Sequence, residues 1–363
     1  MPLLLLALLF LATAGSRAAD LALLPGMPPL LNPSDIYSAD RPGDLSPVVR
    51  NYPPRIYVPD SGSKSVTVID PASYRVLDEF RVGRQPQHVT PSYDLKTLWV
   101  LNDKGNSLTR IDPATGKKGN TIRVSDPYNM YYTPDGKYAI VVAEARKRLN
   151  FLDVVTMKPV HSLKVPCKGV DHIDFSADGR YFIASCEFSG MLLKVDVADQ
   201  TLLGTLELAK HAMPQDVKLS PDGSVFYVAD MMANGVYLID GVNFRRIAFI
   251  PTGKGAHGLY VSRDSRVLYV SNRDEGSISL IDFAGRRVVR KWQLPGRASP
   301  DMGGVSADGK VLWLSGRYNS EVYAIDTSDG KLLARIPVGR GPHGLCVYPQ
   351  PGRYSLGHTG IFR

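Results

Sequence analysis

A unit of just over forty residues recurs along most of this chain and constrains its fold more than any other feature. Each copy carries an apolar residue followed by Asp, and successive aspartates are separated by 42, 41, 43, 44, 42 and 44 residues. The marker aspartates are Asp70, Asp112, Asp153, Asp196, Asp240, Asp282 and Asp326. Seven copies with so little drift indicate a repeat architecture in which each unit packs on the next.

Each repeat contains four short segments with the pattern of β-strands. A run such as VFYVAD or VLYVSN is followed by a polar turn and by a run such as GVYLID or SISLID. A third run, as in RVLDEFRVG, precedes a fourth that ends in a PDG or ADG turn. Alternation with a period of two is typical of strands, and four strands per repeat are typical of a propeller blade. We therefore predict an all-β, seven-bladed β-propeller with four antiparallel strands per blade.

The two ends of the repeated region predict how the ring closes. The first repeat begins at its second strand, around residues 56–58, and lacks the innermost strand that the later repeats have. The chain supplies a strand-like segment at residues 344–348. We expect this C-terminal strand to complete the N-terminal blade, because closure would leave no open sheet edge. The propeller would then span residues 55–349.

Three segments lie outside the repeats. Residues 1–18 contain an apolar run and end in small residues, as a secretory signal peptide does, which predicts a secreted or cell-envelope protein. The run is shorter than the ~20 residues that cross a bilayer, so we expect no transmembrane span after cleavage. Residues 19–54 are rich in proline and predict a linker or surface strap, and residues 350–363 predict a tail over the surface.

Three cysteines are too few for a disulfide framework, but they allow one bridge. Cys167 precedes the pair Asp171 and His172, and Cys186 ends the adjoining second strand. A disulfide, two buried free thiols, a metal site and a Cys/His nucleophile pair all remain open. If the two thiols are bridged, their Cα atoms should lie within ~7 Å of each other. Cys346 lies among apolar residues and is expected in the core.

At this point the sequence resembles the YVTN-type seven-bladed β-propeller repeat family, whose members include exported, YncE-like bacterial proteins. The resemblance rests on YVSN at residues 269–272, SISLID at 277–282 and VGRGPHG at 338–344. It covers nearly all of residues 55–349 and implies the propeller fold and export. Relatives include binding proteins, electron-transfer partners, lactone hydrolases and cofactor-carrying propellers, so the resemblance implies no single activity.

Chemistry is expected where the repeats differ along the channel at the axis of the ring. The innermost strands line that channel, so residues at equivalent positions converge from all seven blades. Alignment of the repeats gives one ring of Gln87, Tyr128, Asp171, Gln215, His257, Asp301 and His343. The next position gives His88, Asn129, His172, Asp216, Gly258, Met302 and Gly344.

Histidines are enriched in the segments that lead to these inner strands, where five of the seven fall: His88, His172, His211, His257 and His343. His257, Asp301 and His343 come from successive blades, and imidazole with carboxylate can bind a divalent transition metal. We predict these three as metal ligands. We predict the residues across the axis as ligand- or cofactor-binding: His88, Asp171, His172, Gln215 and Asp216. A structural role in lining a polar channel is the alternative for each histidine.

These observations leave three classes of function open. The first is an exported propeller that binds a ligand or protein partner at its axial funnel without catalysis, because no compact catalytic motif is present. The second is a metal- or cofactor-dependent enzyme or cofactor-handling protein centred on the axial residues. The third is a basic propeller that binds an anionic envelope polymer or single-stranded nucleic acid, since the formal net charge is +8. The charges are interspersed, however, and no Lys/Arg run marks a binding arm.

Overall fold

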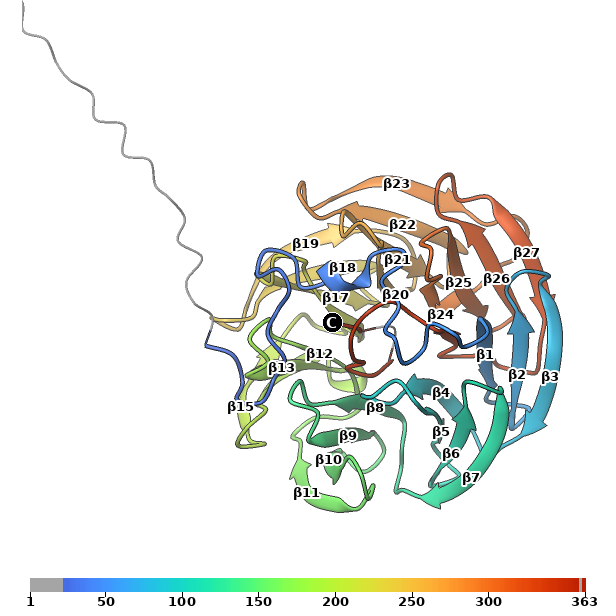
Figure 1. Cartoon of the computed structure of the whole chain (residues 1–363). Helices are drawn as coiled ribbons and strands as arrows, with labels where there is room; N and C mark the ends of the chain where they lie inside the picture. The colour runs from blue at the N-terminus through green and yellow to red at the C-terminus, as the bar shows by residue number, and fades with distance from the viewer. Residues whose placement is uncertain (1–21, 359–360) are drawn as a thin grey trace, which may run out of the picture.

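The computed structural model describes residues 22–358 and 361–363, and the signal peptide expected at residues 1–18 lies outside them. Seven four-stranded antiparallel sheets are arranged around a central axis (Figure 1). Within the described residues the only helices are two short 3-10 turns, η1 (Ser38–Asp40) and η2 (Glu187–Ser189). The all-β, seven-bladed propeller predicted from the repeats is confirmed.

The first four blades run from the N-terminal strands to the middle of the chain, and each is given from its inner to its outer strand. Blade 1 contains β28 (Cys346–Tyr348), β1 (Arg55–Asp60), β2 (Ser65–Asp70) and β3 (Arg75–Arg81). Blade 2 contains β4 (Pro86–Pro91), β5 (Leu98–Asn102), β6 (Ser107–Asp112) and β7 (Lys117–Arg123). Blade 3 contains β8 (Asn129–Tyr132), β9 (Tyr138–Ala143), β10 (Arg148–Asp153) and β11 (Pro159–Lys164). Blade 4 contains β12 (Val170–Phe175), β13 (Tyr181–Cys186), β14 (Met191–Asp196) and β15 (Leu202–Glu207).

The last three blades follow in the same order. Blade 5 contains β16 (Pro214–Leu219), β17 (Val225–Asp230), β18 (Gly235–Asp240) and β19 (Arg245–Pro251). Blade 6 contains β20 (Ala256–Val261), β21 (Val267–Asn272), β22 (Ser277–Asp282) and β23 (Arg287–Gln293). Blade 7 contains β24 (Pro300–Val305), β25 (Val311–Gly316), β26 (Glu321–Asp326) and β27 (Leu332–Pro337). In every blade the inner strands are buried, whereas the outer strand ranges from half-buried to exposed.

The C-terminal strand closes the ring, as the sequence predicts. β28 pairs with β1 in antiparallel register, with Ile56 opposite Val347 and Tyr57 opposite Cys346. The strand is shorter than the predicted segment 344–348, because Gly344 instead forms a bridge with His88 of blade 2. The closing strand therefore completes the sheet of blade 1, and the residues just before it contact blade 2 at the axis.

The repeat-marker aspartates shape the turns that follow them. Asp70 accepts a hydrogen bond from the backbone N–H of Ala72 at 3.0 Å, and Asp112 accepts one from Ala114 at 3.0 Å. The bond that Ser73 donates to Asp70 holds the pKa of this carboxyl below its usual value. A carboxylate that accepts bonds two and three residues further along fixes the turn between the third and fourth strands.

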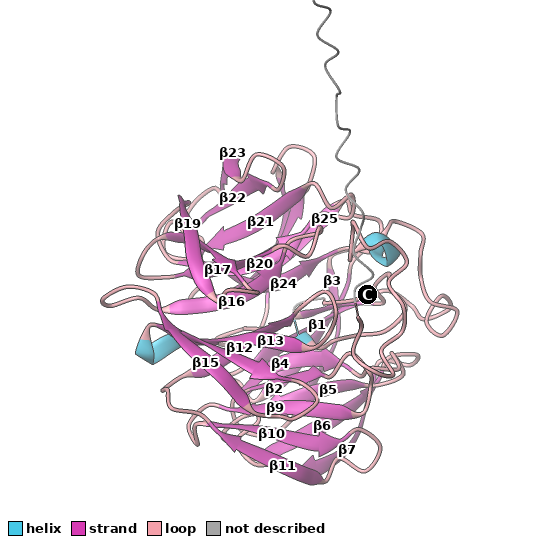
Figure 2. Cartoon of the chain, turned by 90° about the vertical axis from the view of Figure 1, so that its left-hand side faces the viewer, coloured by secondary structure: helices cyan, strands magenta, loops and turns pink. Residues whose placement is uncertain are grey.

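The N-terminal segment 22–54 lies across one face of the ring, where the inner strand of each blade turns back into the second. The backbone N–H of Leu24 donates to Asp178, and that of Ile36 donates to Pro221, both at 2.8 Å. Leu24, Ile36 and Val49 are buried. Figure 2 shows this segment and the C-terminus on the same side of the propeller. This segment is hereafter called the strap.

The C-terminal tail differs from its predicted course over the surface. Leu356, His358, Phe362 and Arg363 are buried, and Figure 1 places the chain end near the middle of the ring. The carbonyl of Leu356 accepts a bond from Tyr132 of β8, and Arg363 lies 3.3 Å from the carboxylate of Asp174 on β12. Apolar and charged residues of the tail thus find partners on the inner strands, which a surface course would not give them.

Candidate metal centre in the axial channel

Bulges in the inner strands give the axial residues their positions. In blades 4, 5, 6 and 7 the pairing of the inner strand skips two consecutive residues: 171–172, 215–216, 257–258 and 301–302. A bulge interrupts the strict alternation of a strand and redirects its side chains. The second-strand serines Ser185, Ser271 and Ser315 accept the backbone N–H groups of residues 172, 258 and 302. Six of the eight predicted site residues therefore lie in bulges of the inner strands.

His257, Asp301 and His343 converge on one point of the channel. Each offers one ligand atom such that all three atoms lie within 4.8 Å of one another. His257 Nδ1 is 3.1 Å from Asp301 Oδ1, and His343 Nε2 is 3.5 Å from Asp301 Oδ2. The side chains are at most 4% exposed. Asp301 Oδ2, which faces His343 Nε2, has no hydrogen-bond partner among the described residues, so this oxygen is available to a ligand.

The surroundings of this trio include a cation and a thioether. Arg273 Nη1 lies 3.1 Å from Asp301 Oδ1, and Met302 Sδ lies 3.0 Å from His257 Nδ1. Burial, reinforced by Arg273 or Arg317, holds the pKa of His257 and of His343 well below the usual value. Both imidazoles are therefore neutral near pH 7, which is the form that binds a metal ion.

Two of the residues predicted across the axis, Gln215 and Asp216, are held by other groups of the protein. Asp216 accepts the backbone N–H groups of Val217 and Leu259, both at 2.9 Å, and Gln215 donates to the carbonyl of Met213. Burial raises the pKa of Asp216 to about 6. These bonds join blade 5 to blade 6 through Asp216 and leave its carboxylate oxygens engaged.

His172 and Asp171 form a second buried pair in blade 4. His172 Nδ1 lies 3.3 Å from both Asn129 Nδ2 and Tyr131 Oη, and burial lowers the pKa of His172 to about 3. His172 Nε2 is 3.2 Å from Asp171 Oδ1, although the two groups are not aligned for a hydrogen bond. The structure places Asp171 with His172 rather than with the trio of blades 6, 7 and 1.

A histidine of the tail, which sequence reasoning missed, joins the channel. The ring of His358 lies 4.0 Å from that of His88 and 5.1 Å from that of His172, measured between ring centroids. His88 also lies 4.8 Å from His343, so it connects the two halves of the channel. His211, which the sequence grouped with the axial histidines, is exposed on a loop instead. The tail has no repeat, so no alignment could place His358.

Charged residues lie at the turns between the second and third strands of four blades. Arg273 and Arg317 follow β21 and β25, whereas Glu144 and Glu187 follow β9 and β13. Burial, followed by the charge of Glu187, raises the pKa of Glu144 to about 7. Basic groups therefore stand beside the trio, and acidic groups stand on blades 3 and 4.

Cys167 and Cys186 form a disulfide with a Cα separation of 6.1 Å. The bridge ties the loop before β12 to the end of β13 and confirms the geometric prediction. The alternatives of two free thiols, a metal site and a Cys/His nucleophile pair are wrong for these cysteines. Cys346 is buried and unbridged, as expected.

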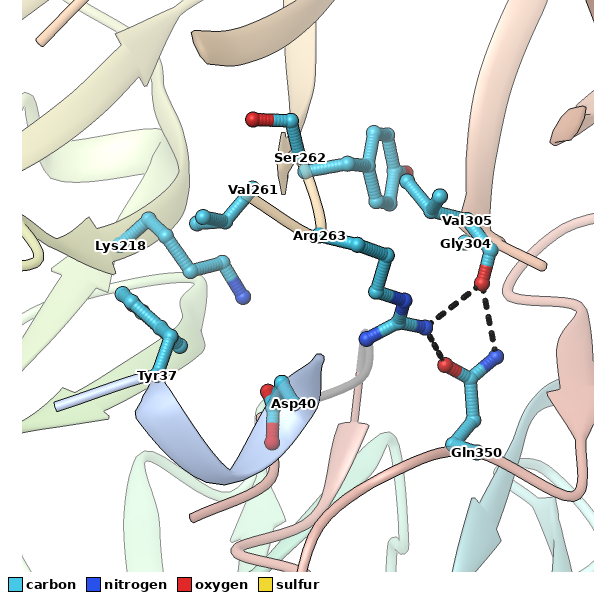
Figure 3. Close-up of a pocket in the computed structure, with 10 residues that line it drawn as sticks. Tyr37, Asp40, Lys218, Val261, Ser262, Arg263, Gly304, Val305 and Gln350 are labelled. Atoms are coloured by element: carbon cyan, nitrogen blue, oxygen red, sulfur yellow. Dashed lines mark hydrogen bonds between the residues drawn. The ribbon is translucent and has the colours of Figure 1, made fainter. Parts of the chain in front are cut away.

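A small pocket beneath the strap lies apart from the trio and encloses about 30 Å³. Arg263 donates to the carbonyl of Val305 at 2.8 Å and to the side chain of Gln350, and Gln350 donates to the same carbonyl at 3.0 Å (Figure 3). Such a volume accommodates about one water molecule. The mutual hydrogen bonds of Arg263 and Gln350 indicate a structural role for this region.

Comparison with known proteins agrees with the fold and the arrangement of its repeats. A family model described as a YNCE-like β-propeller matches residues 16–352. The chain belongs to this family. The uncharacterised protein YncE of Salmonella typhi is 22% identical over 277 residues, which are 69% of this chain and 74% of the relative.

Other similar proteins carry different activities. A nitrite reductase of Stutzerimonas stutzeri is 22% identical over 306 residues, or 77% of this chain but only 51% of the reductase. A structure from hydrazine synthase of Kuenenia stuttgartiensis has a TM-score of 0.63 at 19% identity, covering 74% of this chain and 91% of that chain. The structure of the dihydro-heme d1 dehydrogenase NirN in complex with DHE has a TM-score of 0.61 at 17% identity, covering 84% and 76%. These likenesses show the fold alone.

Across residues 22–358 and 361–363, no helix has the length and apolar character needed to cross a membrane.

Proposed function

We propose that this protein is an exported binding propeller that holds a transition-metal ion in its axial channel, with His257, Asp301 and His343 as ligands. The observation that carries the proposal is the convergence of two imidazoles and one carboxylate from three blades at a buried point, with ligand atoms within 4.8 Å. Donor atoms around one ion lie about 3–3.5 Å apart when the metal bonds are about 2.0–2.2 Å long. The separations of 3.1 and 3.5 Å within the trio agree with that spacing.

The small size of the site favours an ion over a larger cofactor. The side chains of the trio are at most 4% exposed, and the Met302 side chain beside them is fully buried. The proposal is therefore limited to a metal ion bound without catalysis.

Metal content of the purified protein tests the proposal. The protein should be produced without a histidine tag in a host that exports it. Elemental analysis by mass spectrometry should then find about one transition-metal ion per chain. His257→Ala and His343→Ala should each remove the ion, because each deletes a proposed ligand. His161→Ala is the matched control, since His161 lies exposed on β11, outside the channel. Equal metal content in all four proteins would exclude these ligands.

Export and the choice of partner need separate measurements. Cleavage after Ala18 should give a mature protein that begins at Ala19, which N-terminal sequencing of the extracytoplasmic fraction can detect. A full-length chain retained in the cytoplasm would contradict export. The alternative of an anionic polymer or single-stranded nucleic acid as partner predicts an affinity that falls steeply with salt. A binding curve that does not change with salt would exclude it.

A further inference from the structure

Met302 distinguishes the trio from a site built of nitrogen and oxygen donors alone. Its side chain is fully buried, and its sulfur lies 3.0 Å from His257 Nδ1 and 3.7 Å from the Tyr260 hydroxyl. The separation from His257 is that of neighbouring donors around one ion. The thioether therefore stands where a fourth ligand would stand, next to His257 and one residue after Asp301.

The charge balance of the site bears on the charge of the ion. Arg273 is 7% exposed and lies 3.1 Å from Asp301, so its positive charge offsets the carboxylate. The other donors are two imidazoles and a thioether, which are neutral. Burying a net charge in a protein interior is costly, and the cost rises steeply with the charge of the ion. A site whose carboxylate is already paired with Arg273 favours a monovalent ion over a divalent one.

Softness and charge point to the same metal. Sulfur ligands favour soft or borderline ions such as Cu(I) and Zn(II), whereas oxygen-rich sites suit Mg²⁺, Ca²⁺ and Mn²⁺; of the first two ions, only Cu(I) is monovalent. Imidazole binds copper as well as zinc. We propose that the ion at His257, Asp301 and His343 is monovalent copper and that Met302 is its fourth donor. This inference rests on the proposed function and names the metal of the same site.

The experiment compares Cu(I) and Zn(II) binding by the full-length mature protein after metal removal. Cu(I) affinity is measured without oxygen in competition with bicinchoninate, and Zn(II) affinity in competition with a chromophoric chelator. The wild type should bind Cu(I) at least 100-fold more tightly than Zn(II). Met302→Leu should lower the preference for Cu(I) over Zn(II) at least 10-fold, because leucine keeps the volume and removes the sulfur.

Two control variants separate the thioether from other causes. Met130 is buried on the inner strand β8 and packs in an apolar cluster, so Met130→Leu makes the same change away from the trio. It should leave both affinities unchanged. Cys346 is the free thiol and the alternative sulfur ligand for copper. X-ray absorption at the copper edge should show a sulfur neighbour in wild type and Cys346→Ser, but not in Met302→Leu.

The outcomes distinguish this inference from the proposed function. Zn(II) binding that depends on His257 and His343, without a preference for Cu(I), would overturn the copper assignment and leave the metal site standing. Unchanged Cu(I) affinity in a folded Met302→Leu variant would also overturn it. Failure of the wild type to bind Cu(I) would overturn the copper assignment, and the absence of any transition metal from the purified protein would overturn the metal site as well. Thermal unfolding of each variant establishes that the compared proteins are folded.

Discussion

Blades 6, 7 and 1 bring donor groups from three blades to one point of the channel, with ligand atoms within 4.8 Å of one another. In blades 4 and 5 the polar residues at equivalent positions either bond to other groups of the protein or, like Asp171 and His172, form a pair within one blade. Asp301 Oδ2 and His343 Nδ1 accept or donate no hydrogen bond within the described chain. Both oxygens of Asp216, in contrast, accept backbone N–H groups, and His172 Nδ1 contacts Asn129 and Tyr131. A position in the repeat decides where a side chain points. Its neighbours decide whether it can bind anything else.

The largest expected effect on metal affinity comes from replacing His343 with alanine, and the matched variant is His172→Ala on the other side of the channel. His343→Ala should weaken metal affinity at least ~1,000-fold, because loss of a ligand exceeds the 10–100-fold cost of losing a ligand's outer partner. His172→Ala should change the affinity less than ~3-fold. Competition titration on folded samples measures both. An equal loss in the two variants would mean that the halves of the channel form one site.

Removal of the disulfide tests whether blade 4 contributes to the stability of the propeller and not to metal binding. The bridge closes a loop of 19 residues, so the double change Cys167→Ser and Cys186→Ser should lower the free energy of unfolding by about 3 kcal/mol. Metal affinity should not change, since the bridge does not contact the trio. Chemical denaturation and metal titration on the same variant provide the two readings. Loss of metal binding at unchanged stability would contradict the view that blade 4 stabilises the ring without taking part in the metal site.

Asp216→Asn should affect stability and not metal binding. The substitution replaces one carboxylate oxygen by an N–H donor, which cannot accept the backbone N–H of Val217 or Leu259. Losing one buried hydrogen bond to a charged group should cost about 2 kcal/mol. Denaturant unfolding gives this value, and metal titration gives the comparison. A weaker metal site with unchanged stability would place Asp216 among the ligands.

A pH-dependent effect on the free energy of unfolding is expected at Asp60, which ends the second strand of blade 1. Asp60 is buried and accepts a bond from Thr67, whereas blades 2 and 6 carry Asn102 and Asn272 at this position, which donate to equivalent hydroxyls. Burial, reinforced by the charge of Glu79, raises the pKa of Asp60 to about 7.

Because this pKa is raised in the folded state, the stabilising contribution of protonated Asp60 is present below about pH 4 and is lost as the pH rises through about 7. Asp60→Asn should match the wild type at pH 4 and exceed its free energy of unfolding by about 4 kcal/mol at pH 8, since a shift of one pKa unit corresponds to about 1.4 kcal/mol. Denaturation at both pH values measures the difference. A constant difference between them would contradict the titration of Asp60.

The sequence was sufficient to predict features that the repeat itself determines. The spacing of the marker aspartates gave the number of blades, and the missing first strand gave the closure by β28. Convergence of His257, Asp301 and His343 followed from their equivalent positions in successive blades. The proximity of Cys167 and Cys186 followed from the loops that carry them.

Features set by contacts outside the repeat could not be predicted. His358 reaches the channel through an aperiodic tail whose apolar residues pack on the inner strands. Arg273 meets Asp301 from a turn that the alignment of inner strands did not include. Met302 stood in the second aligned ring, but its contact with His257 depends on a bulge that turns two consecutive residues out of the ladder. Hydrogen-bond satisfaction of Asp216 likewise depends on the neighbouring blade.

Anomalous diffraction from crystals of the mature protein loaded with its metal tests the central claim most directly. Data collected above and below the absorption edge of that metal locate the ion without assuming its ligands. The account predicts one peak between His257, Asp301 and His343. A peak beside His172 and Asp216, or the absence of any peak within the axial channel of a metal-loaded crystal, would contradict it.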